Sequence, residues 1–311
     1  MKRVVVIGGG VAGMSAAVTL AECGFGVTIV ERQMRLGGHT AEWYRLAPDF
    51  ESAAETVQNL VDRVRRLGVE VVLGAEVVEW SPHSVTLHSG EVLAAEGVLV
   101  CTGFDLFDAR RKEEYGYGIY RGVISTADLE RALRQGGVGA LPVERPRRIA
   151  FLQCVGSRDL AIGSLHCSRM CCITSVKQAI ELRALLPDAE IYDFYMDMRC
   201  FGAGYEELYF SAQTDYRIEF IRGRISEAAE MLDGRIAIKA EDTLLSRPLR
   251  LNVDLLVLAV GMNPTFPSVR RDLPQGVLYA GAASSPKSVE ESINDAVAKA
   301  HQLFANNQPQ Q

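Results

Sequence analysis

Four of the seven cysteines of the 311-residue chain stand close together in the sequence, where their thiols could act as one chemical site. Cys154 is followed after twelve residues by Cys167, and Cys171 and Cys172 come within the next five positions. Four thiolates are the usual ligands of an iron–sulfur cluster, and zinc accepts the same set. Buried, inert cysteines are the alternative. A dithiol–disulfide mechanism is disfavoured because no Cys-x-x-Cys pair is present.

A second chemical signal is a glycine fingerprint near the start of the chain. Gly8, Gly10 and Gly13 match G-x-G-x-x-G between an apolar run and an Ala-rich segment, and Glu31 follows about 20 residues later. Such glycines allow a tight turn, close approach of a pyrophosphate and close helix–strand packing, and the acid binds ribose hydroxyls. A glycine turn without a ligand is the alternative. The residues expected at this dinucleotide site are Gly8, Gly10, Val11, Ala12, Gly13, Glu31 and Arg32.

Three further features favour FAD over NAD as the dinucleotide. A second glycine pair follows Glu31, two later strands end in one residue and glycine, and the strand 277–280 runs through Gly281 toward a C-terminal helix. The N-terminus of that helix could face the flavin ring or its ribityl chain. The additional residues expected to contact the flavin cofactor are Gly37, Gly38, His39, Thr102, Gly103, Gly261, Gly281, Ala282 and Ser288.

The first part of the chain predicts a strand–helix–strand unit that would position the fingerprint. Apolar β-branched runs predict strands at 2–8 and 27–30, and the Ala-rich segment 11–23 predicts the helix between them. The two strands of such a unit are parallel, with a right-handed crossover. An amphipathic helix is expected at 51–67, followed by short strands over 69–103.

A charged, tyrosine-rich stretch after Gly103 marks the crossing to a second α/β unit, which would carry the cysteines. Strands are expected at 147–153 and 190–196, with a helix near 167–185 between them, so that Cys167 and Cys171 would share a helix face. Further elements are expected as strands at 217–222, 235–240, 253–260 and 277–280 and a closing helix at 288–305. The expected domains are therefore 1–115 with 250–311 for FAD, and 116–249 for the cysteines.

Composition excludes several classes of protein. The formal net charge is -6, and no cluster of unopposed Lys and Arg offers the basic face that nucleic acid requires. No apolar run approaches the roughly 20 residues needed to cross a bilayer, and the first run is too short for a signal peptide. A cytoplasmic protein is expected. In that reducing compartment grouped cysteines indicate chemistry and not structural disulfides.

With these motifs the chain resembles the two-dinucleotide-binding-domain flavoproteins of the thioredoxin reductase type, α/β proteins in which the FAD domain is split by an inserted second α/β domain. Two departures are visible. The turn after the strand 147–153 reads CVGSRD, without the glycine fingerprint that binds NADPH in that architecture. The Gly-Asp usual near the last strand is Gly281-Ala282 here, which leaves the ribityl contact in question.

The segments FLQCVGSRD, CSRMCCITSVKQAI, FGAGYEELY and AGAASSPKSVEESI resemble the A subunit of heterodisulfide reductase over nearly the whole chain. The resemblance implies one FAD, one 4Fe-4S cluster on Cys154, Cys167, Cys171 and Cys172, and no pyridine nucleotide site. Zinc is then disfavoured, since it would have no electronic reason to lie beside a flavin. The resemblance also points Lys177 toward the flavin ring as a catalytic residue, with a solvated surface lysine as the alternative.

The chain lacks cysteines between Gly38 and Cys101, so it is more similar to the short A-type subunit of heterodisulfide-reductase-like complexes of sulfur oxidisers. The expected function is therefore FAD and 4Fe-4S electron transfer in such a complex, with other subunits as partners and a homodimer also expected. The alternatives are the A subunit of a quinone-interacting complex of sulfate reduction and an electron-bifurcating heterodisulfide reductase subunit. An assembly protein without cofactor and a free-standing NAD(P)H-dependent disulfide reductase are less favoured.

Overall fold

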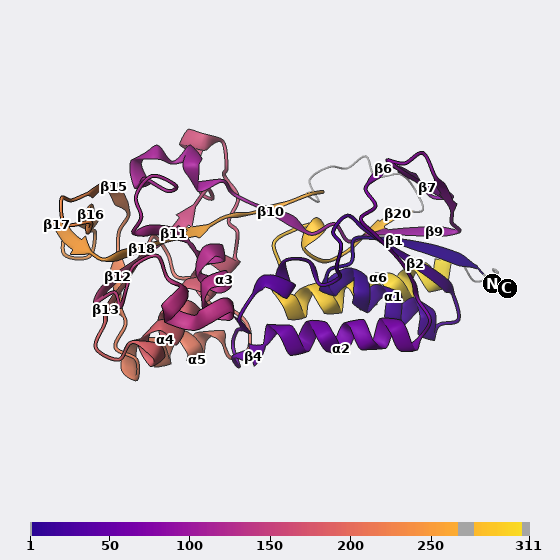
Figure 1. The fold of residues 1–311 in the computed structure, drawn as a ribbon, viewed down its shortest axis with the longest axis horizontal. Coiled ribbons are helices and arrows are strands. Elements are labelled where there is room, and N and C mark those ends of the chain that lie inside the picture. The colour runs from indigo at the N-terminus through magenta and orange to yellow at the C-terminus, as the bar shows by residue number, and fades with distance from the viewer. Residues whose placement is uncertain (1, 267–276, 307–311) are drawn as a thin grey trace. The chain divides into compact units, whose positions relative to one another are not determined.

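A computed structural model describes residues 2–266 and 277–306, which form two compact units (Figure 1). The first unit comprises residues 1–42, 52–105 and 263–311, and the second comprises 43–51 and 106–262. The sequence placed the boundaries at 115 and 250. The structure groups 106–115 with the second unit because Tyr115 is buried in its core, and groups 250–262 with it because a central strand of its sheet lies there.

The first unit is built on a five-stranded sheet in the order β20-β9-β1-β2-β5, with every neighbouring pair parallel. Its elements are β1 (Arg3–Ile7), α1 (Val11–Glu22), β2 (Gly26–Glu31), the 3-10 helix η1 (Gly38–Glu42), α2 (Ala53–Arg66), β5 (Glu70–Leu73), β6 (Val77–Ser81), β7 (Ser84–Leu87), β8 (Val92–Ala94), β9 (Gly97–Val100), β20 (Val277–Tyr279), the 3-10 helix η6 (Gly281–Ala283) and α6 (Val289–Asn306).

Alternation along β1 explains why both faces of this sheet are covered. Val4 and Val6 pack in a core shared with α1, α2 and α6, whereas Val5 and Ile7 pack in a second core with β7. Figure 1 shows the three helices together on one side of the sheet. A strand buried on both faces reads as a continuous apolar run, which is the pattern that predicted β1.

The second unit repeats this plan with a parallel sheet in the order β11-β18-β12-β13-β14. Its elements are β3 (Arg45–Leu46), η2 (Ala109–Arg111), η3 (Glu113–Tyr115), β11 (Val123–Ser125), α3 (Thr126–Gly136), η4 (Gly137–Ala140), β12 (Arg148–Val155), η5 (Leu160–Ile162), α4 (Met170–Leu185), β13 (Glu190–Tyr195), α5 (Tyr205–Thr214), β14 (Glu219–Arg222), β15 (Ile225–Glu230), β16 (Ile236–Asp242), β17 (Arg247–Val253) and β18 (Leu255–Val260). At the boundaries in sequence lie β4 (Glu51–Ser52), β10 (Phe104–Leu106) and β19 (Met262–Pro264).

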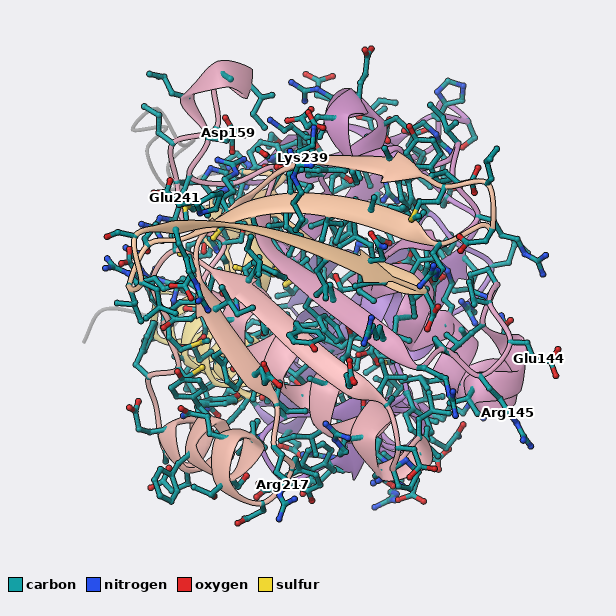
Figure 2. All side chains as sticks on the ribbon, turned by 90° about the vertical axis from the view of Figure 1, so that its left-hand side faces the viewer. Glu144, Arg145, Asp159, Arg217, Lys239 and Glu241 are labelled. Carbon is teal, nitrogen blue, oxygen red and sulfur yellow. The ribbon has the colours of Figure 1, made fainter. Side chains whose placement is uncertain are left out.

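The central strand β12 separates the two cores of this unit. Ile149 and Phe151 face the core formed with α3, α4 and α5, and Ala150 and Leu152 face the antiparallel sheet β15-β16-β17. Figure 2 views the unit across that sheet, in which Lys239 and Glu241 lie on β16. In the described part of the chain no helix is both long enough and apolar enough to cross a membrane.

Candidate functional site

The glycine fingerprint lies on the turn from β1 into α1. Gly8 has φ +105°, and a Cβ there would lie 2.4 Å from the carbonyl oxygen of Cys101. A Cβ on Gly13 would lie 1.9 Å from the carbonyl oxygen of Gly8. At Gly10, by contrast, an added Cβ meets nothing among the described residues closer than Gly38 Cα at 4.0 Å. Packing therefore requires glycine at positions 8 and 13, while Gly10 leaves space against the N-terminus of α1, where Val11 and Ala12 begin the helix.

The acid at the end of β2 faces this turn, as the fingerprint predicts. Glu31 is buried, and its Oε2 accepts a hydrogen bond from the backbone N–H of Gly9 at 2.6 Å. Its Oε1 accepts from the backbone N–H of Gln33 at 2.8 Å, whereas the neighbouring Arg32 is exposed. The carboxylate is thus fixed beside the glycine turn, in the place from which it could exchange a backbone partner for ribose hydroxyls.

The second glycine pair packs directly against the first turn. The N–H of Gly37 donates to the carbonyl oxygen of Gly9 at 2.8 Å. Gly38 has φ +55°, and a Cβ there would lie in tight contact with Gly10, 3.2 Å from its Cα. His39 then stacks on the ring of Phe104 with 4.4 Å between ring centroids. The two glycine pairs, from segments remote in the sequence, therefore form a single backbone surface.

The end of β9 and the segment after β19 meet at two threonines. Thr102 Oγ1 and Thr265 Oγ1 are 2.6 Å apart, and Thr265 Oγ1 donates to the carbonyl oxygen of Gly103 at 2.9 Å. Gly261, which the sequence assigned to the same cofactor site, belongs to the second unit, where it lies against Gly156 and Ser168. The assignment of Gly261 to the cofactor site therefore stays a prediction. The strand β18 before it is part of the other sheet.

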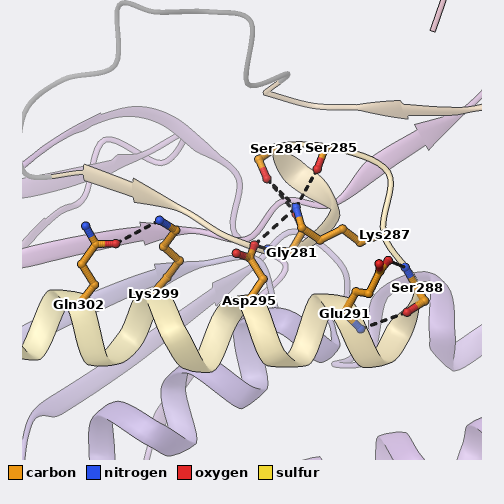
Figure 3. A network of polar contacts seen from close by, with 9 residues as sticks. All are labelled: Gly281, Ser284, Ser285, Lys287, Ser288, Glu291, Asp295, Lys299 and Gln302. Carbon is orange, nitrogen blue, oxygen red and sulfur yellow. Dashed lines mark hydrogen bonds and ion pairs between the residues drawn. The ribbon is translucent and has the colours of Figure 1, made fainter. Parts of the chain in front are cut away.

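A polar network orders the loop that follows β20 (Figure 3). Gly281 has φ +66°, and a Cβ there would lie 2.6 Å from the Cβ of Ala12, so this loop touches the first turn of α1. The N–H of Gly281 donates to Asp295 Oδ2 at 2.8 Å. Lys287 Nζ donates to the carbonyl oxygen of Gly281 at 3.0 Å and lies 3.5 Å from Asp295 Oδ2. Ala282 is buried in η6.

Lys287 and Asp295 are absent from the residues predicted for this site. A carboxylate from α6 thus contacts the backbone at position 281, next to Ala282, where the sequence showed no acid. Ser288 caps α6 instead of facing an open space: its Oγ accepts from the N–H of Glu291 at 3.0 Å, and its own N–H donates to Glu291 Oε2 at 2.9 Å. The Ser-x-x-Glu spacing of a capping box was the sequence signal for that role.

The cysteine loop begins where β12 departs from regular pairing. The register of β12 with β18 shifts between Leu152 and Val155, and Cys154 has φ +61°. Arg158 and Arg169, at φ +52° and +58°, are also left-handed. Non-glycine residues rarely adopt this conformation, and such strain collects at functional sites. The helix α4 begins only at Met170, because the left-handed Arg169 precedes it. Cys167 therefore lies in the loop, and the expectation that it shares a helix face with Cys171 is wrong.

The four thiols lie around this loop and the first turn of α4. Cys154, Cys171 and Cys172 are buried, and Cys167 is partly exposed. Cys154 Sγ is 3.9 Å from Cys171 Sγ, while Cys172 Sγ lies 3.7 Å from the carbonyl oxygen of Asp197. Among the described residues, no three His, Cys, Asp or Glu side chains are grouped as a ready metal-binding set.

Electrostatics in the loop couples the thiols to one another. The hydrogen bond with Cys171 and burial raise the pKa of the Cys154 thiol well above its ordinary value. The pKa of Cys171 is also raised: its bond with Cys154 lowers the pKa, but contact with Cys172, burial and the nearby Cys167 outweigh that effect. Cys154 and Cys171 are thus held as neutral thiols here, and a cationic metal centre would reverse these two shifts by stabilising the thiolates.

Contacts beyond the cysteines hold the loop in place. Asp159 is buried, and its Oδ2 accepts from Lys112 Nζ at 3.0 Å and from Arg224 at 2.7 Å. His166 Nε2 is 3.0 Å from the carbonyl oxygen of Met262. Lys112 belongs to the charged stretch that the sequence predicted only as a crossing between domains. Nothing in that stretch predicted that Lys112 pairs with the buried Asp159.

Lys177 is a buried residue of α4. Its Nζ donates to the carbonyl oxygen of Arg45 at 2.9 Å, forms an ion pair with Glu130 of α3, and lies 3.3 Å from Glu181 Oε2. Burial raises the pKa of Glu181 to about 7, despite the opposing effect of Lys177. The alternative of a solvated surface lysine is wrong. The structure gives Lys177 two carboxylate partners of the second unit, which the sequence analysis did not single out.

Comparison with known proteins agrees with this architecture. A family model described as pyridine nucleotide-disulphide oxidoreductase matches residues 2–129. Among solved structures, thioredoxin reductase from T. acidophilum matches with a TM-score of 0.67 and 18% identity, covering 98% of this chain and 99% of that chain. Thioredoxin reductase from Lactococcus lactis matches with a TM-score of 0.65 and 16% identity, covering 98% and 100%. These structures show a thioredoxin-reductase-like fold, which confirms the predicted fold class, and the family model marks residues 2–129 as similar to pyridine nucleotide-disulphide oxidoreductases.

Curated relatives narrow this class. The A subunit of H(2):CoB-CoM heterodisulfide,ferredoxin reductase from Methanothermobacter thermautotrophicus is 34% identical over 254 residues, which cover 72% of this chain and 38% of the relative. The iron-sulfur A subunit of CoB--CoM heterodisulfide reductase from Methanocaldococcus jannaschii is 29% identical over 390 residues, covering 96% and 58%. The chain belongs to the family of heterodisulfide reductase A subunits. It spans about 38% of the length of the first of these relatives.

Proposed function

We propose that this chain is the FAD- and 4Fe-4S-carrying electron-transfer subunit of a heterodisulfide-reductase-like complex in the cytoplasm, working in dissimilatory sulfur oxidation. The observation that carries the proposal is that all four cysteines belong to the strained β12–α4 segment, where Cys154 Sγ lies 3.9 Å from Cys171 Sγ. The same chain also holds an open dinucleotide fingerprint. Other subunits of the complex would be the partners. A homodimer stays a prediction.

The residues of the first unit fit a dinucleotide. FAD, when bound, supplies exchange of electrons in pairs or singly. The backbone at Gly10, with space in front of the N-terminus of α1, would receive the pyrophosphate, and Glu31 would hold the ribose hydroxyls. Gly37 and Gly38 let a second stretch of backbone approach the cofactor, and the loop at Gly281 borders the same turn through Ala12.

The residues of the second unit fit an iron–sulfur cluster by their chemistry. A cluster, when bound, supplies single-electron transfer, and four Cys thiolates are its usual ligands. Cys154, Cys167, Cys171 and Cys172 would hold it. Asp159, tied to Lys112 and Arg224, would keep the loop in the shape that presents them. Lys177 is proposed to influence the flavin, with Glu130 and Glu181 setting its position.

The sulfur-oxidation setting is supported by the internal length of the chain. No cysteine lies between Gly38 and Cys101. The alignment with the M. jannaschii relative, at 390 residues, is longer than this chain, so that relative carries inserted residues within the matched region. A protein with one cluster offers one electron path of its own, which favours simple transfer over bifurcation. The A subunit of a quinone-interacting complex of sulfate reduction is the second candidate.

Anaerobic reconstitution tests the proposal. The full chain is purified, incubated with FAD, iron and sulfide, and desalted, and bound flavin and iron are then quantified alongside absorption and electron paramagnetic resonance spectra. We expect one FAD and four iron atoms per chain. The variant C171A should lose the iron and keep the flavin, and C23A, which alters a cysteine at the end of α1 away from both sites, should keep both. A colourless wild-type protein would overturn the proposal, and bleaching of the flavin by NADH or NADPH alone would favour a free-standing reductase.

A further inference from the structure

A carboxylate buried behind the cysteine loop takes no part in the site described above. Asp193 lies on β13 in the second unit and is fully buried. Its side chain points to the face of the sheet that packs against α4, since the Gln153 amide that donates to Asp193 also donates to Ser175 of that helix. Asp193 is four residues before Asp197, whose carbonyl oxygen contacts Cys172.

Two polar side chains connect Asp193 with the backbone of the cysteine loop. Gln153 Nε2 donates to Asp193 Oδ2 at 3.1 Å and to Ser175 Oγ at 3.0 Å. Ser175 Oγ in turn donates to the carbonyl oxygen of Cys172 at 3.0 Å. Gln153 directly precedes Cys154 on β12. A buried polar chain therefore runs from the carboxylate to the peptide units of two of the four thiols.

This series of hydrogen bonds leaves two buried oxygen acceptors without a donor. Within the described residues, Asp193 Oδ1 and Gln153 Oε1 are both buried without a hydrogen-bond partner. A buried acceptor without a donor is unfavourable, and a buried charge without a counter-ion is more so. A proton on Oδ1 would remove the charge and would convert an acceptor without a donor into a donor.

The charged and titratable groups around Asp193 do not supply a counter-ion. Cys200 and Tyr209 respond to its charge, and the pKa of each is raised to about 12, chiefly by burial, so both are neutral at neutral pH. Glu206 of α5, which also acts on both, is an acid. On α4, Lys177 is paired with Glu130 and Glu181. Burial accordingly raises the pKa of Asp193 to about 7, although Ser175 and Gln153 oppose the rise.

We propose that Asp193 takes up one proton from solvent when one electron enters the thiolate site of the cysteine loop, and releases that proton when the electron leaves. The inference rests on the proposed function, because it requires the cluster. One electron and one proton enter together: an O–H bond forms on Asp193, the cluster is reduced by one electron, and the net charge of the region is unchanged. The electron comes from a one-electron donor, which is reduced flavin in the proposed function and dithionite in the test.

The coupling follows from charge and is reciprocal. An added electron in a poorly solvated interior makes the neighbouring carboxylate a stronger base. By linkage, a protonated carboxyl makes the electron acceptor easier to reduce by the same free energy. With Asp193 ionised above about pH 7, reduction of the cluster should consume one proton above this pH and none well below it.

The test measures the midpoint potential of the reconstituted cluster from pH 6 to 9, by dithionite titration followed by electron paramagnetic resonance. In the wild type we expect the reduced-to-oxidised ratio at a fixed potential to fall up to tenfold per pH unit above about pH 7, which is up to 59 mV per unit for one electron. Asp193→Asn, which mimics the protonated form, should flatten this dependence. Asp188→Asn, an exposed carboxylate just before β13, should leave it unchanged.

Failures of the inference and of the proposed function are distinguishable. A protein that takes up no iron overturns both. A protein with a cluster whose potential ignores pH, or whose slope persists in Asp193→Asn, keeps the proposed function and overturns the inference. Infrared difference spectra of the wild type, recorded above the pH at which Asp193 ionises, add a direct readout: reduction should create a protonated carboxyl band, and its absence overturns the inference. If Asp193→Asn does not fold, Ser175→Ala replaces it. Losing a hydrogen bond that lowers the pKa of Asp193 should move the onset of the slope to higher pH.

Discussion

Lys287 Nζ lies 3.0 Å from the carbonyl oxygen of Gly281, while the N–H of Gly281 donates to Asp295, which is itself 3.5 Å from Lys287. One glycine is thus held through both of its peptide groups by two opposite charges. Lys287 Nζ also donates to Ser284 and Ser285, so a single ammonium closes the whole loop that borders the fingerprint helix (Figure 3).

Replacing this lysine should weaken FAD binding more than it weakens the fold. Lys287→Met removes charge-assisted hydrogen bonds worth about 1.5–3 kcal/mol each when made to a charged group, and part of that loss falls on the loop next to the cofactor. We expect the Kd for FAD to rise about tenfold, which corresponds to about 1.4 kcal/mol. Flavin fluorescence quenching measures it.

Lys299→Met is the matched control. Lys299 lies on α6, the helix that carries Asp295, and donates to Gln302 Oε1 at 3.0 Å, away from the loop at Gly281 (Figure 3). Its replacement should leave FAD binding at the wild-type level. Equal affinities of Lys287→Met and wild type would show that the loop needs no such closure.

Two glycines of the fingerprint should separate folding from binding. Gly13→Ala places a Cβ 1.9 Å from the carbonyl oxygen of Gly8, so the helix and the strand must move apart. Gly10→Ala fills space that the described residues leave open. We expect Gly13→Ala to lower the free energy of unfolding of the apoprotein by about 1–3 kcal/mol, as overpacking does. Gly10→Ala should fold normally and bind FAD poorly. Urea unfolding and flavin titration measure the two effects, and reversed effects would contradict this account of the turn.

The fingerprint shows which features a sequence predicts well. Gly8, Gly13 and Glu31 are constrained by one local turn and one strand register, so their spacing alone predicted their meeting. The segment 43–51 joins the second unit through contacts such as Tyr44 N–H to Glu130, 86 residues away, and no local pattern encodes such a contact. The prediction that Cys167 lies on the helix was wrong because Arg169 adopts φ +58°, so that the helix begins only after it.

Polar partners were the largest omission. Asp193 and Asp295 lie on a strand and a helix that the sequence predicted, whereas Glu130 lies on α3, which it did not predict. A single acid in an apolar pattern is usually a surface residue. The partners that these acids find are Gln153, Lys287 and Lys177, respectively. The sequence therefore singled out the cysteines and glycines, whose spacing is local. It missed the charged and polar partners, because these come from segments far apart in the sequence.

The anchor of the cysteine loop should be sensitive to acid. Burial alone would raise the pKa of Asp159, but its hydrogen bonds to Lys112 and Arg224 lower it below the ordinary 3.8. The stabilisation is thus fully present above pH 3.8 and is lost as the pH falls through the lower value of the folded protein. Asp159→Asn should lower the free energy of unfolding by about 3 kcal/mol at neutral pH, and the difference from wild type should shrink below pH 4.

Urea unfolding between pH 3 and 7 measures this difference. Asp233→Asn is the control, because Asp233 forms an exposed ion pair with Arg235 and should change stability little. A difference between Asp159→Asn and wild type that stays constant down to pH 3 would mean that the lost stability is packing and not charge.

Glu181 should act in the opposite direction. Burial raises its pKa from 4.5 to about 7, so the folded protein binds a proton there that the unfolded chain has released. Stability from this group is therefore fully present below pH 4.5 and is lost as the pH rises toward 7, at up to about 1.4 kcal/mol per pH unit. Glu181→Gln cannot ionise and should show a smaller fall in the free energy of unfolding over this interval. Glu207→Gln, which replaces an exposed glutamate on α5, should follow the wild type.

Asp193 titrates in the same direction, so part of the pH dependence should remain when Glu181 alone is replaced. Only the double replacement of Glu181 and Asp193 should remove most of it. A Glu181→Gln curve parallel to that of the wild type would show that Glu181 stays ionised throughout and would contradict this prediction.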